Sequence, residues 1–283
     1  MIGGSRAEDR CGTGTGRGRL AGGGVRRASR VGRVPADIFW TSAFLDFAAG
    51  DAEAGVRFWS AVTGYPVSPW RGDDAEFATL LPPAGDDFLR VQRLRTGPGR
   101  LHLDLHVPDP AIAARLAADL GATITHRSPH GYVVLASPGG FTFCFVAHPA
   151  AVRPPAARWA GHTSLVDQLC LDVRAADAER ETRFWSDLTG WAPTTSSTGS
   201  LVPLDRPPGL PLRLMVQAVG DDRFPATAHL DLAASDRAAE TERHQVLGAA
   251  VLDVTGRFTV LRDPTGRAYC VTDRDPVTGR LPG

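Results

Sequence analysis

The chain has 283 residues, of which 43% are hydrophobic, and this is enough to build the cores of two ordinary domains. Its 31 basic and 31 acidic residues balance, and no apolar run approaches the roughly 18 residues of a membrane span, so we expect no membrane segment. The N-terminus lacks the apolar stretch of a signal peptide and the four cysteines form no CxxC pair, so we expect a cytoplasmic protein without a disulfide framework.

Residues 1–36 are rich in glycine and contain eight arginines against Glu8 and Asp9. Because they hold almost nothing large and apolar, they cannot bury enough surface to offset the entropy of ordering, and we expect a disordered tail. A basic tail of this kind can contact nucleic acid electrostatically, and the alternative is an unstructured leader or an over-long start assignment. The rest of the chain is mildly acidic, so we expect no nucleic-acid surface there.

From Phe39 onwards the pattern is that of a packed domain. It predicts a strand over 43–47, then a helix with Asp51 as its N-cap that ends at Gly64. Three short strands follow, at 66–68, 75–81 and 88–94. One strand, one helix and three strands make a βαβββ unit.

The next stretch repeats that order. A strand over 101–107 precedes a helix that begins at Pro110 and ends at Gly121, with Ile112, Leu116 and Leu120 expected on its buried face. Strands are predicted at 123–126, 132–136 and 141–146. Two βαβββ units therefore make one α+β domain.

The whole pattern then returns about 126 positions later. Arg57-Phe58-Trp59-Ser60 recurs as Arg183-Phe184-Trp185-Ser186, and His102-Leu103-Asp104-Leu105 recurs as His229-Leu230-Asp231-Leu232. A constant offset indicates tandem copies of one domain. We predict a tail at 1–36, domain 1 at 39–148, a linker at 149–161, domain 2 at 162–275 and a second tail at 276–283.

Paired βαβββ units with a Phe-Trp helix, a His-Leu-Asp-Leu strand and a final Val-Leu-x-x-Pro-x-Gly-x-x-(Phe/Tyr)-Cys strand resemble the vicinal-oxygen-chelate superfamily. That superfamily includes glyoxalase I, the extradiol dioxygenases and the bleomycin-resistance proteins. The resemblance implies cup-shaped mixed sheets, four units in all, with a metal at the floor of the cup when one is present. It also implies a monomer that contains its own pseudo-dimer.

Carried over by position, the resemblance implies a set of pocket and ligand positions in each domain. In domain 1 these are Ser42, Gln92, His102 and Thr142, and in domain 2 they are Gln168, Gln217, His229 and Ala268. Active relatives usually have a glutamate where Thr142 and Ala268 stand here. His102 and His229 remain the only candidate metal ligands of the usual type, so we expect no cofactor, and a site for Zn, Ni, Mn or Fe that is incomplete.

The strand pattern adds acidic residues to the same faces. Alternation puts Asp104 beside His102 and Asp231 beside His229, where the carboxylates can supply charge, act as partners of the histidines or pair with arginine. Asp46 and Asp172 occupy matching first-strand positions and can be buried acids, caps or salt-bridge partners. The same parity turns Cys144 and Cys270 towards the cup, while the helix spacing of Trp59 and Trp185 predicts packing residues.

Three functional hypotheses follow. The first is a protein whose cups bind a small organic molecule, a metabolite or an antibiotic, without metal-centred turnover. The second is a metal-dependent lyase, isomerase or dioxygenase that uses His229 with Gln168, Gln217 or Asp231. The third is a structural or regulatory module in which the arginine-rich tail is a nucleic-acid arm.

Overall fold

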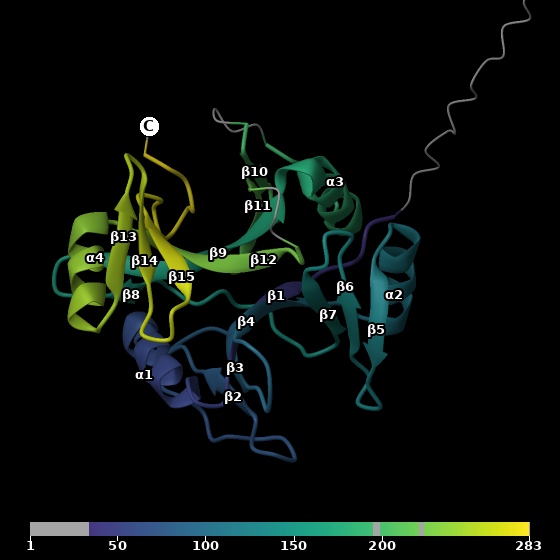
Figure 1. Cartoon of the computed structure of the whole chain (residues 1–283), viewed down its shortest axis with the longest axis horizontal. Helices are drawn as coiled ribbons and strands as arrows, with labels where there is room; N and C mark the ends of the chain where they lie inside the picture. The colour runs from purple at the N-terminus through teal and green to yellow at the C-terminus, as the bar shows by residue number, and fades with distance from the viewer. Residues whose placement is uncertain (1–33, 195–198, 221–223, 283) are drawn as a thin grey trace, which may run out of the picture. The chain divides into compact units, whose positions relative to one another are not determined.

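Two mixed β-sheets, each with helices on one face, make up the described part of the chain (Figure 1). The structure, a computed structural model, describes residues 34–194, 199–220 and 224–282. The predicted tail therefore lies, for residues 1–33, outside the described residues. Residues 34–282 belong to one compact unit that includes both sheets.

The helices and strands of domain 1 follow the predicted order of two βαβββ units, apart from one short strand. They are β1 (Trp40–Phe47), α1 (Ala52–Thr63), β2 (Phe77–Leu80), β3 (Leu89–Arg93), β4 (Arg100–His106), α2 (Pro110–Asp119), β5 (Thr123–Arg127), β6 (Val133–Ala136) and β7 (Thr142–Val146). The strand expected at 66–68 is reduced to a single bridge between Val67 and Leu80.

Domain 2 repeats this order after a short additional strand. Its elements are β8 (Ala157–Arg158), β9 (Thr163–Arg174), a 3-10 turn η1 (Ala175–Asp177), α3 (Ala178–Thr189), β10 (Leu201–Leu204), β11 (Arg213–Val219), β12 (Thr227–Ala234), α4 (Arg237–Val246), β13 (Ala250–Val254), β14 (Phe258–Arg262) and β15 (Ala268–Thr272). Strand β8 belongs to the predicted linker and pairs with β9.

The first strands of the two units lie side by side at the centre of each sheet. The order is β2-β3-β1-β4-β7-β6-β5 in the first sheet and β10-β11-β9-β12-β15-β14-β13 in the second. Strands β1 and β4 are antiparallel, with Phe44 opposite His102. Because side chains alternate along a strand, this pairing places Asp46, His102 and Asp104 on one face and the leucines between them on the other.

The apolar face of each sheet is covered by helices. Helix α2 buries Ala113, Ala114 and Ala117, whereas Ile112 is 58% exposed. The predicted stripe of large residues on α2 was therefore partly wrong: the small alanines let the helix approach the sheet closely, and Leu116 is only partly buried.

The helix ends follow the sequence signals with one exception. Gly64 ends α1 with a φ of 72°, the left-handed conformation that glycine adopts without strain. Asp109 caps α2 by accepting hydrogen bonds from the backbone of Ala111 and Ile112. Asp51 occupies the N-cap position of α1 but is itself in a helical conformation, so its side chain makes no capping bond, contrary to the prediction.

Each domain packs its first helix against the last hairpin of the other domain. On α1, the indole N–H of Trp59 donates to Asp263 at 2.9 Å and the Trp59 ring meets Tyr269 edge-on at 5.2 Å. On α3, the ring of Trp185 meets Phe143 at 5.0 Å. Both tryptophans are fully buried, which confirms them as packing residues. None of the described helices is long and apolar enough to cross a membrane.

Candidate functional site

The open face of the first sheet encloses a cavity of about 350 Å³. Its floor is formed by His102 and Asp104 on β4 together with Thr142 and Cys144 on β7. The walls carry further residues from β1 to β3 and β6, among them Phe44, Phe77, Arg90, Gln92 and Val134. A hollow of this size is in the range of small-molecule sites.

His102 lies between two aspartates. Its Nδ1 is 2.9 Å from Asp46 Oδ2, and its Nε2 is 3.8 Å from Asp104 Oδ1. Asp46 is fully buried and also accepts a hydrogen bond from Arg100 at 3.1 Å, which makes it the salt-bridge partner among the roles considered from sequence. Burial opposes the imidazolium, but the two carboxylates outweigh it and raise the pKa of His102.

Asp104 and Cys144 are buried polar residues that line this cup. Burial raises the pKa of Asp104 even though His102 acts in the opposite direction. Burial next to that carboxylate raises the pKa of the Cys144 thiol well above its usual range, so it is a poor nucleophile. Oδ1 of Asp104 has no hydrogen-bond partner within the described residues.

Ser42, the other first-strand position, does not reach His102. Its hydroxyl lies 2.8 Å from Nε2 of His106, whose Nδ1 lies 2.6 Å from the carbonyl oxygen of His148. This pairing is satisfied by a neutral imidazole that donates from Nδ1 and accepts at Nε2. Burial lowers the pKa of His106 to about 4, which agrees with that state.

The second sheet repeats the arrangement around His229. Nδ1 of His229 is 3.0 Å from Asp172 Oδ2, and its Nε2 is 3.3 Å from Asp231 Oδ1. Cys270 lies beside the same histidine and aspartate. Burial opposes protonation of His229, but Cys170, Asp172 and Asp231 together raise its pKa well above the usual range.

Polar side chains of domain 2 bond to one another across this second cup. The amide of Gln168 donates to Asp231 Oδ2, and the thiol of Cys170 donates to Gln217 at 3.4 Å. Arg274 lies 3.7 Å from Asp231 and bonds to the buried Asp167 through Nε at 3.1 Å. Although burial raises the pKa of Asp231, His229, Arg274 and Gln168 outweigh this effect and lower it.

The positions carried over for a metal do not gather into one ligand set. Ser42 is engaged by His106, Gln92 and Thr142 offer neutral oxygens to the cavity, and Ala268 is exposed and has no donor. The atoms that do converge in the described ranges belong to His102, Asp104 and Cys144, and to their counterparts His229, Asp231 and Cys270. These sets offer a nitrogen, a carboxylate oxygen and a sulfur, and each contains a buried carboxylate oxygen without a partner.

Sequence reasoning missed several residues that line the first cup or contact Asp231 in the second sheet. Arg90 lies on β3 two residues from Gln92, so strand alternation was a signal for it. Arg71 and Tyr132 reach the cavity from a loop and from a position just before β6, and Arg274 follows β15. No motif or periodicity marked Arg71 or Arg274, whereas Tyr132 begins the strand predicted at 132–136 and alternation places it on the same face as Val134.

The comparisons with known proteins match both halves of the chain to one family. The model of the glyoxalase-like domain matches residues 42–146 and again 168–272. A search of curated proteins found no match.

Solved structures share the fold at low sequence identity. A Mn(II)-bound glyoxalase from Novosphingobium aromaticivorans is 17% identical with a TM-score of 0.58, over 87% of this chain and 85% of that one. An extradiol ring-cleaving dioxygenase from B. fuscum is 15% identical with a TM-score of 0.59, over 88% and 75%. Together with the two family matches, these likenesses confirm the predicted α+β fold of tandem cup-shaped domains, and the chain belongs to the glyoxalase-like domain family of the vicinal-oxygen-chelate superfamily.

Proposed function

We propose that the cup of domain 1 binds a small organic anion that carries a flat ring, without metal-centred turnover. The observation that supports this proposal is the cavity of about 350 Å³, whose walls combine arginines with aromatic rings. A metabolite or an antibiotic of this chemical class fits the description equally well.

The arginines give the cup a preference for negative charge. Arg90 pairs with Asp87 at 2.9 Å, and Arg100 pairs with Asp46. Arg71 makes no ion pair with any residue that the structure describes, and burial together with the nearby Arg90 lowers its pKa. A ligand carboxylate beside Arg71 would counteract both effects with its negative charge and accept charge-assisted hydrogen bonds from the guanidinium.

The aromatic side chains suit a ring on the ligand. Phe44 stacks on His102 with 4.4 Å between ring centroids and meets Phe77 edge-on at 6.2 Å. Tyr132 lines the cavity as well. Such walls favour an apolar ring through offset or edge-on contacts.

Isothermal titration with benzoate and its neutral analogue benzamide tests this proposal. We expect benzoate to bind more tightly than benzamide, and Arg71→Ala to weaken benzoate by about tenfold, which corresponds to about 1.4 kcal/mol. Arg127→Ala is the matched control, because Arg127 is exposed on β5 and does not line the cavity. Equal affinity for the two compounds, or an equal loss in both variants, would contradict the proposal.

A second candidate function is a metal-dependent enzyme of the lyase, isomerase or dioxygenase type that uses the His229 site. It is favoured by Oδ1 of the buried Asp231, which makes no hydrogen bond within the described residues and lies 3.3 Å from His229 Nε2. His229, Asp231 and Cys270 would hold the ion, and a bound divalent ion would act as a Lewis acid. Asp172, bonded to Nδ1, would orient the imidazole.

Elemental analysis of the purified protein separates the two candidates. Stoichiometric metal that is lost in His229→Ala and retained in the exposed-surface variant His130→Ala would favour the enzyme. Metal at trace level in the wild type and in His130→Ala would exclude the metal-dependent enzyme.

A further inference from the structure

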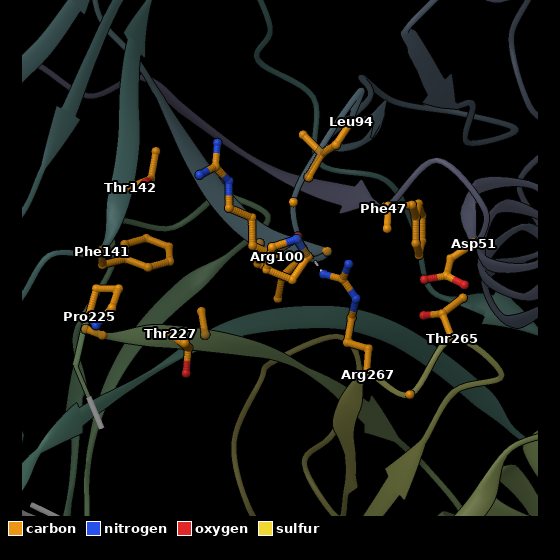
Figure 2. Close-up of a pocket in the computed structure, with 18 of the residues that line it drawn as sticks. Phe47, Asp51, Leu94, Arg100, Phe141, Thr142, Pro225, Thr227, Thr265 and Arg267 are labelled. Atoms are coloured by element: carbon orange, nitrogen blue, oxygen red, sulfur yellow. Dashed lines mark hydrogen bonds between the residues drawn. The ribbon is translucent and has the colours of Figure 1, made fainter. Parts of the chain in front are cut away.

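A second and larger hollow adjoins the first cup. It has a volume of about 680 Å³ and is lined by segments of both domains, including residues 96–101 on one side and 225–228 on the other. Arg100 and Thr142 line both this interdomain cavity and the cup. Figure 2 shows the side chain of Arg100 extending towards Thr142. The two hollows therefore meet at this pair of residues.

The interdomain cavity contains a rigidly held cation. Arg267 donates through Nη1 to the carbonyl oxygen of Arg100 at 2.8 Å and through Nη2 to that of Asp46 at 2.7 Å. Its guanidinium also lies 5.0 Å from the ring centre of Phe47. Figure 2 shows the guanidinium of Arg267 directed towards Arg100, with a dashed line for the hydrogen bond. Both backbone contacts come from domain 1, so Arg267 holds one position between the domains.

Arg267 still has donors to offer. A guanidinium carries five N–H groups, and the two backbone contacts leave the others available. No carboxylate of the described residues lies within 4.0 Å of it, and burial lowers its pKa. The hydroxyl of Thr265 lies on the same wall but already donates to Asp263 at 2.7 Å, so the donors left for a ligand are those of Arg267. An acidic group of a ligand would accept hydrogen bonds from the remaining N–H groups of Arg267.

We propose that the ligand of the first cup is an elongated diacid, whose ring lies in the cup and whose chain passes Arg100 and Thr142 to place a second acidic group on Arg267. This inference rests on the proposed function, because the cup holds the ring end. It adds the class of ligand: an aromatic acid with a flexible acidic side chain rather than a compact single-ring acid. The larger volume of the interdomain cavity suits the chain and its terminal group.

Titration with a homologous series tests this inference. The probes are benzoate and para-substituted benzoates that carry carboxyalkoxy chains of increasing length, each with its methyl ester at the chain end. We expect the chain of matching length to bind about tenfold more tightly than benzoate, and the ester to lose that gain. Arg267→Gln should remove the gain and leave the affinity for benzoate unchanged, and Arg267→Lys should restore part of it.

A second variant keeps the test independent of the backbone contacts of Arg267. Ala228 lines the interdomain cavity and not the cup, so the ring in Ala228→Phe should obstruct that cavity and also abolish the gain for long acids. Long acids that bind no better than benzoate, or a gain that survives in both Arg267→Gln and Ala228→Phe, would overturn the inference. Failure of benzoate itself to bind would instead overturn the proposed function.

Discussion

Asp104 and Asp231 occupy equivalent places in the two domains, 127 positions apart, beside equivalent histidines. The pKa of Asp104 is raised by burial, whereas the pKa of Asp231 is lowered. The difference comes from their neighbours. Asp231 receives the amide of Gln168 and lies near Arg274, while Asp104 borders an open cavity.

The residues of domain 1 that correspond to Gln168 and Arg274 are found at an offset of 126 positions. Gln168 corresponds to Ser42 and Arg274 corresponds to His148. In domain 1 these two positions serve a separate network, in which Ser42 and the carbonyl of His148 hold a neutral His106. Equivalent positions therefore serve different networks in the two domains: one around Asp231 in domain 2, and one around His106 beside the open cup of domain 1.

Among the substitutions that test this comparison, Arg274→Leu should have the largest effect on stability. It leaves the buried carboxylates of Asp167 and Asp231 without their cation, so we expect a loss of about 3–5 kcal/mol in the free energy of unfolding, measured in urea. Adding Asp167→Asn should recover part of the loss. His148→Leu at the corresponding position of domain 1 is the control, because its hydrogen bond with His106 is made through the backbone carbonyl and its ring makes only an edge-on contact with His106 at 6.1 Å. A loss below 1 kcal/mol in Arg274→Leu would break the comparison.

The domain 1 network should make stability depend on pH. His106 is neutral in the fold, with a pKa of about 4 against an ordinary value near 6.5. Because the pKa is lower in the folded protein, the contribution of neutral His106 to the free energy of unfolding is complete above pH 6.5 and is lost as the pH falls towards 4. The shift in pKa corresponds to about 3 kcal/mol. Urea unfolding measured between pH 7 and 4 should show this loss in the wild type. In His106→Gln the free energy of unfolding should fall less steeply with pH. Identical slopes would show that His106 is not held neutral.

The paired variants Asp104→Asn and Asp231→Asn compare the environments of the two equivalent aspartates directly. Asp231→Asn removes a charge that His229 and Arg274 stabilise, and we expect a loss of about 2 kcal/mol in the free energy of unfolding. Asp104→Asn removes a charge that burial already disfavours, so its effect should lie within about 0.5 kcal/mol of zero. Equal losses in the two variants would refute the assignment of the difference to Gln168 and Arg274.

The smallest effects should come from positions where the two domains agree. Asp109 and Asp236 cap their helices through side-chain bonds to backbone N–H groups, so each change to alanine should cost about 1 kcal/mol. Asp51→Ala, at an N-cap position without such a bond, is the control and should change stability by less. Unequal losses at Asp109 and Asp236 would show that the domains differ beyond their cups.

The sequence was sufficient for features that depend on local pattern. Strand alternation placed His102, Asp104 and Cys144 on one face, and the constant offset predicted the second copy of every element. It was insufficient for contacts between distant segments. Nothing near Trp59 indicates that its indole bonds to Asp263, 204 residues away, and Arg71 lies in a loop without periodicity. The failure of Asp51 as a cap is a backbone effect, since its φ and ψ are already helical.

The exchange of first helices between the domains limits how the chain can be divided. Separating the halves at the linker would expose the aromatic side of α1, with Phe58 and Trp59, and that of α3, with Phe184 and Trp185. Neither half would be soluble alone, but a backbone cut in the linker should leave a nicked complex that stays together. The tandem arrangement thus makes the core of each domain depend on a helix of the other within a single chain.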